Sequence, residues 1–93
     1  MYERILQRFR ESVRSLDYVI PLHADEEMDE DGLSVFDLEN AVLTGEIVER
    51  QRDGGTREWK YVLSGDALDG SAVCVVGKLS FTGRLVIITV YRE

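Results

Sequence analysis

The chain has few of the residues that mark several classes of protein. Its 93 residues include one cysteine, one proline, one histidine and one tryptophan. A lone cysteine excludes an internal disulfide framework, and no apolar run approaches the roughly 20 residues that span a bilayer. The first 16 residues, MYERILQRFRESVRSL, are too charged for the apolar core of a secretory signal. These absences predict one domain over residues 1–93, located in the cytoplasm, without a membrane partner.

Positive charge is also scarce, because 11 lysines and arginines stand against 18 aspartates and glutamates, for a net charge of −7. Nucleic-acid binders usually carry a basic surface, so this balance lowers the expectation of RNA binding. The negative charge is unevenly distributed, since six of the seven residues from Asp25 to Asp31 are acidic. A local basic face elsewhere therefore stays compatible with the composition.

The first half of the chain predicts two helices. Apolar side chains recur at helical spacing at Tyr2, Ile5, Leu6, Phe9, Val13 and Leu16. Pro21 indicates that YVIPL (18–22) is a short extended connector, because proline biases the preceding residue away from the helical region. Ser34 is a good N-cap with Asp37 three residues later, and Gly45 lies where a C′ glycine would end the second helix.

From Glu46 the apolar period changes to two and predicts four strands, at 46–52, 57–64, 71–79 and 84–91. RDGGT, SGDALDG and SFTG supply the turns, with glycines that accept positive φ. Short turns favour an antiparallel meander with both helices on one face. The third and fourth strands are apolar in both registers and should be central, whereas the charged first strand suits an edge. The predicted fold class is therefore α+β, with two N-terminal helices packed on a four-stranded antiparallel sheet.

The acidic stretch has a loose likeness to a calcium loop. Positions one, three, five and six of such a loop match Glu27, Asp29, Asp31 and Gly32. Position twelve, however, should hold a bidentate glutamate and holds Leu38 instead. The calcium interpretation fails at that ligand.

A zinc site is no better supported, because His23 and Glu27 at i, i+4 supply two ligands where zinc requires three or four. The simpler interpretation is a solvated helical turn with Ala24 and Met28 packed inward. We therefore predict no metal and no cofactor. His23 keeps two interpretations: a capping or packing residue at a helix start, or a general acid or base with an unperturbed pKa near neutrality.

The sheet offers further candidate side chains. Strict alternation would place Val86, Ile88 and Val90 on one face of the last strand and Leu85, Ile87, Thr89 and Tyr91 on the other. If helices cover the first set, Thr89 and Tyr91 lie on the less covered face. The second strand presents Arg57, Trp59 and Tyr61 on one side and Lys60 with Ser64 on the other, and the third adds Lys78. These groups could form a cationic surface with an aromatic ring to stack a base, or be ordinary rim residues. Cys74, between valines, is expected to be a buried inert thiol.

Several phrases carry a resemblance to a known family: HADEEM, DGLSVFDLENAVLTGEIVER, WKYVLSG and GRLVIITVY. Over residues 18–91 the chain resembles domain-of-unknown-function family 4258, found in bacteria and especially in cyanobacteria. The resemblance implies an arrangement similar to RelE/ParE-like toxins, with helices followed by an antiparallel sheet. Some members lie beside antitoxin-like proteins with a zinc finger. The wider superfamily includes mRNA endoribonucleases that need no metal.

That chemistry is attack of a ribose 2′-hydroxyl on the adjacent phosphate, which requires a base, a cation and an acid. The resemblance implies His23 as base or acid and Tyr91 as proton donor or stacking group. Lys60, Lys78 or Arg84 could be the cation, with Lys60 and Lys78 inferred from strand geometry. Thr89 belongs to the same recurring pattern, and Trp59 could stack a base. Many members carry an arginine four residues after the histidine, where this chain has Glu27, a change that disfavours phosphate.

Two functions of different class follow. The first is a toxin-like protein of a type II toxin–antitoxin module, acting as a metal-independent endoribonuclease on RNA. The second is a non-catalytic interaction module, with a homodimer as one possible assembly, whose acidic face (Glu26, Glu27 and Glu30) binds an antitoxin-like or other basic protein.

Overall fold

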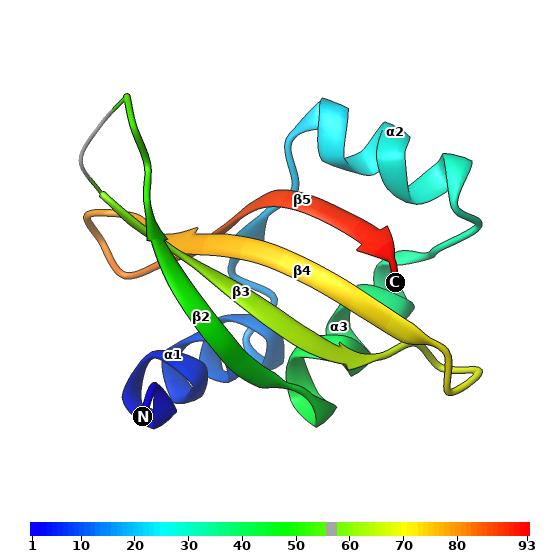
Figure 1. Cartoon of the computed structure of the whole chain (residues 1–93), viewed down its shortest axis with the longest axis horizontal. Helices are drawn as coiled ribbons and strands as arrows, with labels where there is room; N and C mark the ends of the chain where they lie inside the picture. The colour runs from blue at the N-terminus through cyan, green and yellow to red at the C-terminus, as the bar shows by residue number, and fades with distance from the viewer. Residues whose placement is uncertain (56–57) are drawn as a thin grey trace.

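The chain folds as an α+β domain in the computed structural model, which describes residues 1–55 and 58–93 (Figure 1). The elements in that part are α1 (Glu3–Arg14), β1 (Tyr18–Val19), α2 (Leu22–Glu30), α3 (Val35–Thr44), β2 (Glu46–Arg52), β3 (Trp59–Asp66), β4 (Ala72–Leu79) and β5 (Leu85–Arg92). Helices α1 and α3 cover one face of the sheet, and α2 lies beside β5. The predicted fold class is confirmed, but the predicted two helices and four strands are wrong, because α2 and β1 were not foreseen.

Helix α1 buries Leu6, Phe9 and Val13 against the sheet. Its last turn closes with two backbone bonds, from the Asp17 amide to the Ser12 carbonyl (2.8 Å) and from the Leu16 amide to the Val13 carbonyl (3.1 Å). This is the Schellman pattern, whose left-handed position is usually glycine. Leu16 occupies it with φ of 57° and a largely exposed side chain.

Helix α3 begins at the predicted capping box. The Ser34 hydroxyl accepts the Asp37 amide, and the Asp37 carboxylate accepts the Ser34 amide. The amides of Ser34 and Leu68 lower the pKa of Asp37, because they stabilise its charged form.

Gly45 ends α3 as predicted, but with φ of −92° and not in the left-handed conformation of a C′ glycine. The glycine is required by close approach: a Cβ there would lie 2.6 Å from the Ala41 carbonyl oxygen. Gly65 of β3 is closer still, because its Cβ would lie 2.1 Å from the same oxygen. The two glycines therefore let α3 lie directly on the backbone of β3.

The acidic stretch forms a nine-residue helix, α2, where a single helical turn was predicted. Ala24 and Met28, one turn apart, are fully buried against the core, which confirms the inward pair. Gly32 ends the segment with φ of +69°, a conformation that glycine adopts without strain. The helix is stable here because this apolar pair and a stripe of polar contacts hold it to β5, a tertiary effect that local spacing does not report.

The sheet has the strand order β1-β5-β4-β3-β2. Pairing is antiparallel from β2 to β5, and β2 is the predicted edge. The fully antiparallel sheet is a wrong prediction, because β1 lies in the connector 18–22 and pairs parallel to β5. A two-residue strand that pairs 67 positions away leaves no local signal, as in Tyr18 with Leu85. The β2–β3 hairpin is present, but Arg57 lies outside the described residues.

A bulge in β5 overturns the predicted alternation of its faces. Gly77 pairs with Ile87 and Val76 with Thr89, so Ile88 is an extra residue in β5. Buried residues of β5 are consequently Leu85, Ile87 and Val90, so the predicted set Val86, Ile88 and Val90 is wrong. Beyond the bulge, Thr89 and Tyr91 share the face opposite α1 and α3.

We call this face the helix-free face; its middle strands carry Lys60, Val62, Cys74, Val76, Lys78, Thr89 and Tyr91. The opposite face carries the core residues Tyr61, Leu63, Val73, Val75, Ile87 and Val90. Among residues 1–55 and 58–93, no helix has the length and apolarity needed to cross a membrane.

Candidate functional site

One side of α2 is bonded to β5 through residues at i, i+4 and i+8. These residues are His23, Glu27 and Asp31, the last being the C-cap of the helix. The contacts are His23 Nε2 to the Ile88 carbonyl (2.8 Å), the Thr89 hydroxyl to Glu27 Oε1 (2.8 Å) and the Arg92 amide to Asp31 Oδ2 (3.0 Å). We call these three residues the β5 clamp. Strand β1 pairs only with Leu85 and Val86, so the rest of that edge of β5 has no neighbouring strand. The clamp gives hydrogen-bond partners to two backbone groups there, the Ile88 carbonyl and the Arg92 amide.

His23 has a defined structural role in this clamp. A carbonyl accepts, so Nε2 carries the proton that is donated to Ile88, and a neutral ring presents Nδ1 as its acceptor. The carbonyl belongs to the extra residue of the bulge, which gains a partner in this way. This contact matches the capping and packing interpretation of the histidine.

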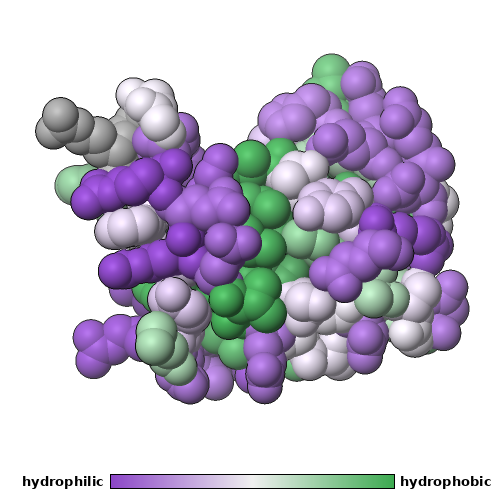
Figure 2. Space-filling view, viewed as in Figure 1, coloured by the Kyte–Doolittle hydropathy of each residue, from purple (hydrophilic) through white to green (hydrophobic). Residues whose placement is uncertain are grey.

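The outer side of α2 carries four exposed carboxylates, which we call the acidic face: Asp25, Glu26, Asp29 and Glu30. Figure 2 shows hydrophilic surface over this helix. Within the described part of the chain, none of the four forms an ion pair. Glu27, which was predicted to belong with Glu26 and Glu30, instead faces Thr89. In the same part of the chain, no three metal-ligating side chains are grouped in a way that could hold an ion.

The structure brings Lys60 and Lys78 together near the β2–β3 hairpin. Tyr61 pairs with Gly77, so the next antiparallel position sets the two lysines opposite each other on the helix-free face. The Lys78 ammonium lies 3.2 Å from the Glu58 carboxylate and 4.0 Å from that of Asp53. These acids offset much of its charge toward an external phosphate.

Tyr91 lies at the other end of the same face. It pairs with Cys74, four residues along β4 from Lys78, which corresponds to roughly 13 Å of strand. Its hydrogen bond with the Cys74 thiol is the main cause that raises the pKa of Tyr91. Burial raises the pKa of Cys74, which keeps this thiol protonated at neutral pH.

The four predicted catalytic residues thus occupy three separate places: the β5 edge for His23, the hairpin end for Lys60 and Lys78, and the opposite end for Tyr91. Figure 2 shows a hydrophobic band across the middle of this face. On the same face, Val62 pairs with Val76 at a position between the lysines and Tyr91. A cation and a proton donor that act on one phosphate must both lie close to it, so roughly 13 Å of strand between Lys78 and Tyr91 disfavours that combination.

The remaining predicted binding residues have partners of their own. Arg84 is paired with Asp17, with 2.8 Å between Nε and Oδ1. The guanidinium carbons of Arg50 and Arg52 lie 4.0 and 4.3 Å from the centroid of the Trp59 ring. These two arginines were missed by sequence reasoning, because the register that sets Arg52 opposite Trp59 was not predicted.

Comparison with known proteins gives one family. The model of a family described as a domain of unknown function (DUF4258) matches residues 21–92. No curated protein and no solved structure matches the chain.

Proposed function

Since this chain belongs to domain-of-unknown-function family 4258, whose description names no activity, we propose a function from its own residues. We infer that it is a non-catalytic interaction module, and that the acidic face of α2 binds a basic protein partner. The observation that supports this is the division of α2 into an inner side bonded to β5 and an outer side of four exposed, unpaired carboxylates.

The acidic face is electrostatically unfavourable to the helix that carries it. Asp29 and Glu30 lie in the last turn of α2, which contains no basic residue. Negative charge at a helix C-terminus opposes the dipole by a few tenths of a kcal/mol per residue. A partner with lysines or arginines at helical spacing would remove this repulsion and gain steering toward the site.

Charge reversal tests the proposal directly. Glu26→Lys with Glu30→Lys should abolish capture of the partner from an extract of the cells that make the protein, and capture by wild type should weaken with added salt. The matched control is Glu11→Lys with Glu49→Lys, which changes the net charge equally at exposed positions on α1 and β2. An identical set of captured proteins from both double variants would contradict the role of the acidic face.

A second candidate is a RelE/ParE-like, metal-independent endoribonuclease of a toxin–antitoxin module, with an antitoxin-like partner. It is favoured by the order of the elements, helices followed by an antiparallel meander. It is also favoured by the cationic and aromatic groups near the hairpin, Lys60, Lys78 and Trp59. The roughly 13 Å of strand between Lys78 and Tyr91 weighs against it.

Inducible expression in a bacterial host tests the second candidate. A toxin would arrest growth, and Tyr91→Phe would relieve the arrest, because Tyr91 is exposed and its ring would remain. His23→Ala needs a parallel thermal melt, since it also removes a bond to β5. Normal growth with soluble wild-type protein would leave only the interaction module.

A further inference from the structure

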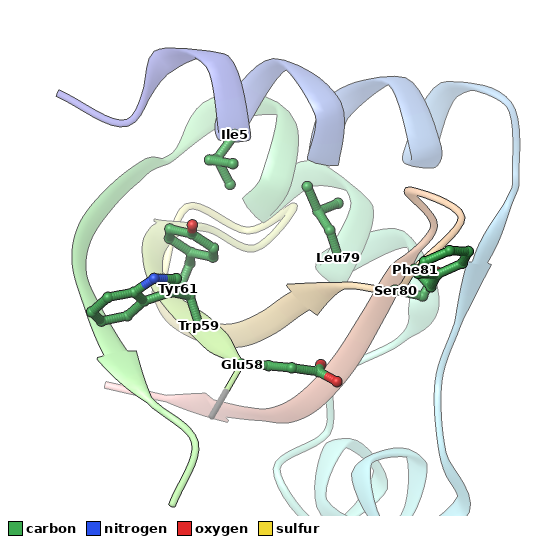
Figure 3. Close-up of a pocket in the computed structure, with 7 residues that line it drawn as sticks. All are labelled: Ile5, Glu58, Trp59, Tyr61, Leu79, Ser80 and Phe81. Carbon is green, nitrogen blue, oxygen red and sulfur yellow. The ribbon is translucent and has the colours of Figure 1, made fainter. Parts of the chain in front are cut away.

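A second surface, remote from α2, has the composition of a ligand site. A cleft of about 340 Å³ lies between α1, β3 and the β4–β5 turn. Its walls are mainly apolar, and its lining residues are Ile5, Glu58, Trp59, Tyr61, Leu79, Ser80 and Phe81. In Figure 3, Trp59 and Tyr61 stand on one side, Leu79 and Phe81 on the other, and Ile5 projects from α1 above them.

The turn between β4 and β5 places an aromatic ring at the rim of the cleft. Phe81 is fully exposed between β4 and β5 and makes one end of the cleft. An exposed phenyl ring gains about 25 cal/mol for each Å² that a ligand removes from water. The volume of the cleft falls in the range typical of small-molecule sites, and its size fits one aromatic ring or branched aliphatic group.

A second cavity of about 370 Å³ adjoins the first, because both are lined by Ile5 and Tyr61. This neighbour contains the side chains of Arg4 and Arg50. Neither arginine forms an ion pair with a carboxylate of residues 1–55 or 58–93. The apolar cleft therefore opens beside two cations that are not paired with any carboxylate in the described part of the chain.

Arg50 connects the two cavities. Its guanidinium lies over the Trp59 ring, 4.0 Å from the centroid, and so is held in place by the aromatic wall of the first cleft. Stacking uses the flat face of a guanidinium and leaves its N–H edge available for a carboxylate. Glu58 at the mouth of the first cleft is balanced by Lys78, so it opposes an anion only weakly.

We propose that these adjoining cavities bind an apolar carboxylate. The apolar group lies between Trp59, Leu79 and Phe81, and the carboxylate meets Arg4 and Arg50. This chemistry has two sources: a small aromatic or aliphatic acid, or the carboxyl terminus of a peptide that ends in an apolar residue. The site is independent of the acidic face, since no residue of α2 lines either cavity.

Fluorescence titration of Trp59, the single tryptophan, tests the proposal on the whole chain. The probes are 4-phenylbutyrate and acetyl-Ala-Ala-Leu with a free carboxylate, each compared with its neutral amide. The carboxylates should bind about tenfold or more tightly than the amides, because hydrogen bonds between charged groups are the stronger class. Binding of both acids supports the shared chemistry; binding of one alone also supports it and identifies the source.

Variants assign the two halves of the site. Arg50→Gln should remove the preference for carboxylate over amide. Phe81→Ser should lower the affinity for the acid and for the amide to a similar extent. Arg14→Gln is the matched control, since this exposed arginine of α1 lines neither cavity and its loss changes the charge equally. Glu26→Lys with Glu30→Lys should leave the titration unchanged.

Three results of the titrations would each overturn the proposal: equal affinity for acid and amide, an Arg50→Gln variant that keeps the preference, or no fluorescence response to any probe. A competition experiment gives a fourth such result. If a single-stranded oligonucleotide displaces the bound acid, binds more tightly than the acid and loses this affinity in Arg50→Gln, the surface binds nucleic acid and the proposal is wrong.

Discussion

Leu16 shows how a residue can oppose the conformation that it occupies. It sits at the left-handed position of the Schellman motif after α1, where φ is 57°, and most of its side chain faces solvent. A residue with a Cβ pays roughly 1 kcal/mol in this region, and exposure gives little burial in return. The helix nevertheless ends here, because both backbone bonds of the motif form.

Leu16→Gly should therefore stabilise the protein, raising the free energy of unfolding by about 0.5–1 kcal/mol despite the added freedom of the unfolded chain. Urea denaturation measures the change. Leu16→Ala is the control, because it removes the same side chain but keeps the Cβ, and it should give no comparable gain. A destabilised glycine variant would mean that the Leu16 side chain contributes packing that its exposure does not indicate.

At the scale of the elements, the contact of α3 with β3 depends on two glycines. The Ala41 carbonyl faces Gly65 at a distance that leaves no room for a methyl group. The atoms that a Cβ added at Gly65 would meet belong to the Ala41 backbone, so they cannot rotate away as a flexible side chain would. The helix itself would have to move away from the sheet.

Gly65→Ala should lower the free energy of unfolding by about 1–3 kcal/mol through overpacking. Thermal or urea unfolding followed by circular dichroism gives the measurement. Gly54→Ala is the control: nothing lies within 4 Å of its added Cβ, so its effect should be near neutral or slightly stabilising. Equal losses in the two variants would contradict the Ala41 contact as the reason for glycine at position 65.

The elements that sequence reasoning predicted and those that it missed differ in where their stability comes from. Local signals defined α1, α3 and the four long strands: the spacing of Leu6, Phe9 and Val13, the Ser34 cap, and the period of two after Glu46. The missed elements, α2 and β1, both depend on β5, more than 60 residues away. The bulge at Ile88 was equally invisible, because an extra residue in an apolar run does not alter the composition of that run.

The candidate site follows the same division. Exposure of the acidic residues and the inward position of Ala24 and Met28 could be predicted from helical spacing. The β5 clamp could have been noticed from the i, i+4, i+8 spacing of His23, Glu27 and Asp31, but its partners could not. The stacking of Arg50 on Trp59 required the register of two strands.

At the scale of the whole molecule, one hydrogen bond ties the short strand β1 to α3. The Tyr18 hydroxyl donates to the Glu39 carboxylate. Burial first, and then the bond and charge of Glu39, raise the pKa of Tyr18 to about 12, from a usual value of 10.0. The folded state therefore retains a proton that the unfolded state loses earlier.

The sign of the pH dependence follows from linkage. The stabilisation is fully present below pH 10 and is lost as the pH rises from 10 through about 12, where the unfolded chain binds fewer protons than the folded one. Tyr18→Phe should remove this part of the slope, so its unfolding free energy should fall less steeply than that of wild type over the same range. Urea titrations at several alkaline pH values measure both, and parallel curves would contradict the assignment.

The β5 clamp also constrains how the molecule comes into being. A ribosome releases α2 long before it releases β5, because Ile88, Thr89 and Arg92 follow their partners by 65, 62 and 61 residues. During that interval Met28 has no strand to pack on, so the segment lacks the contacts that stabilise it as a helix and presents the six carboxylates from Asp25 to Asp31 to solvent. Mutual repulsion and hydration of these carboxylates would keep the segment in solvent, and formation of the docked helix would follow the synthesis of β5.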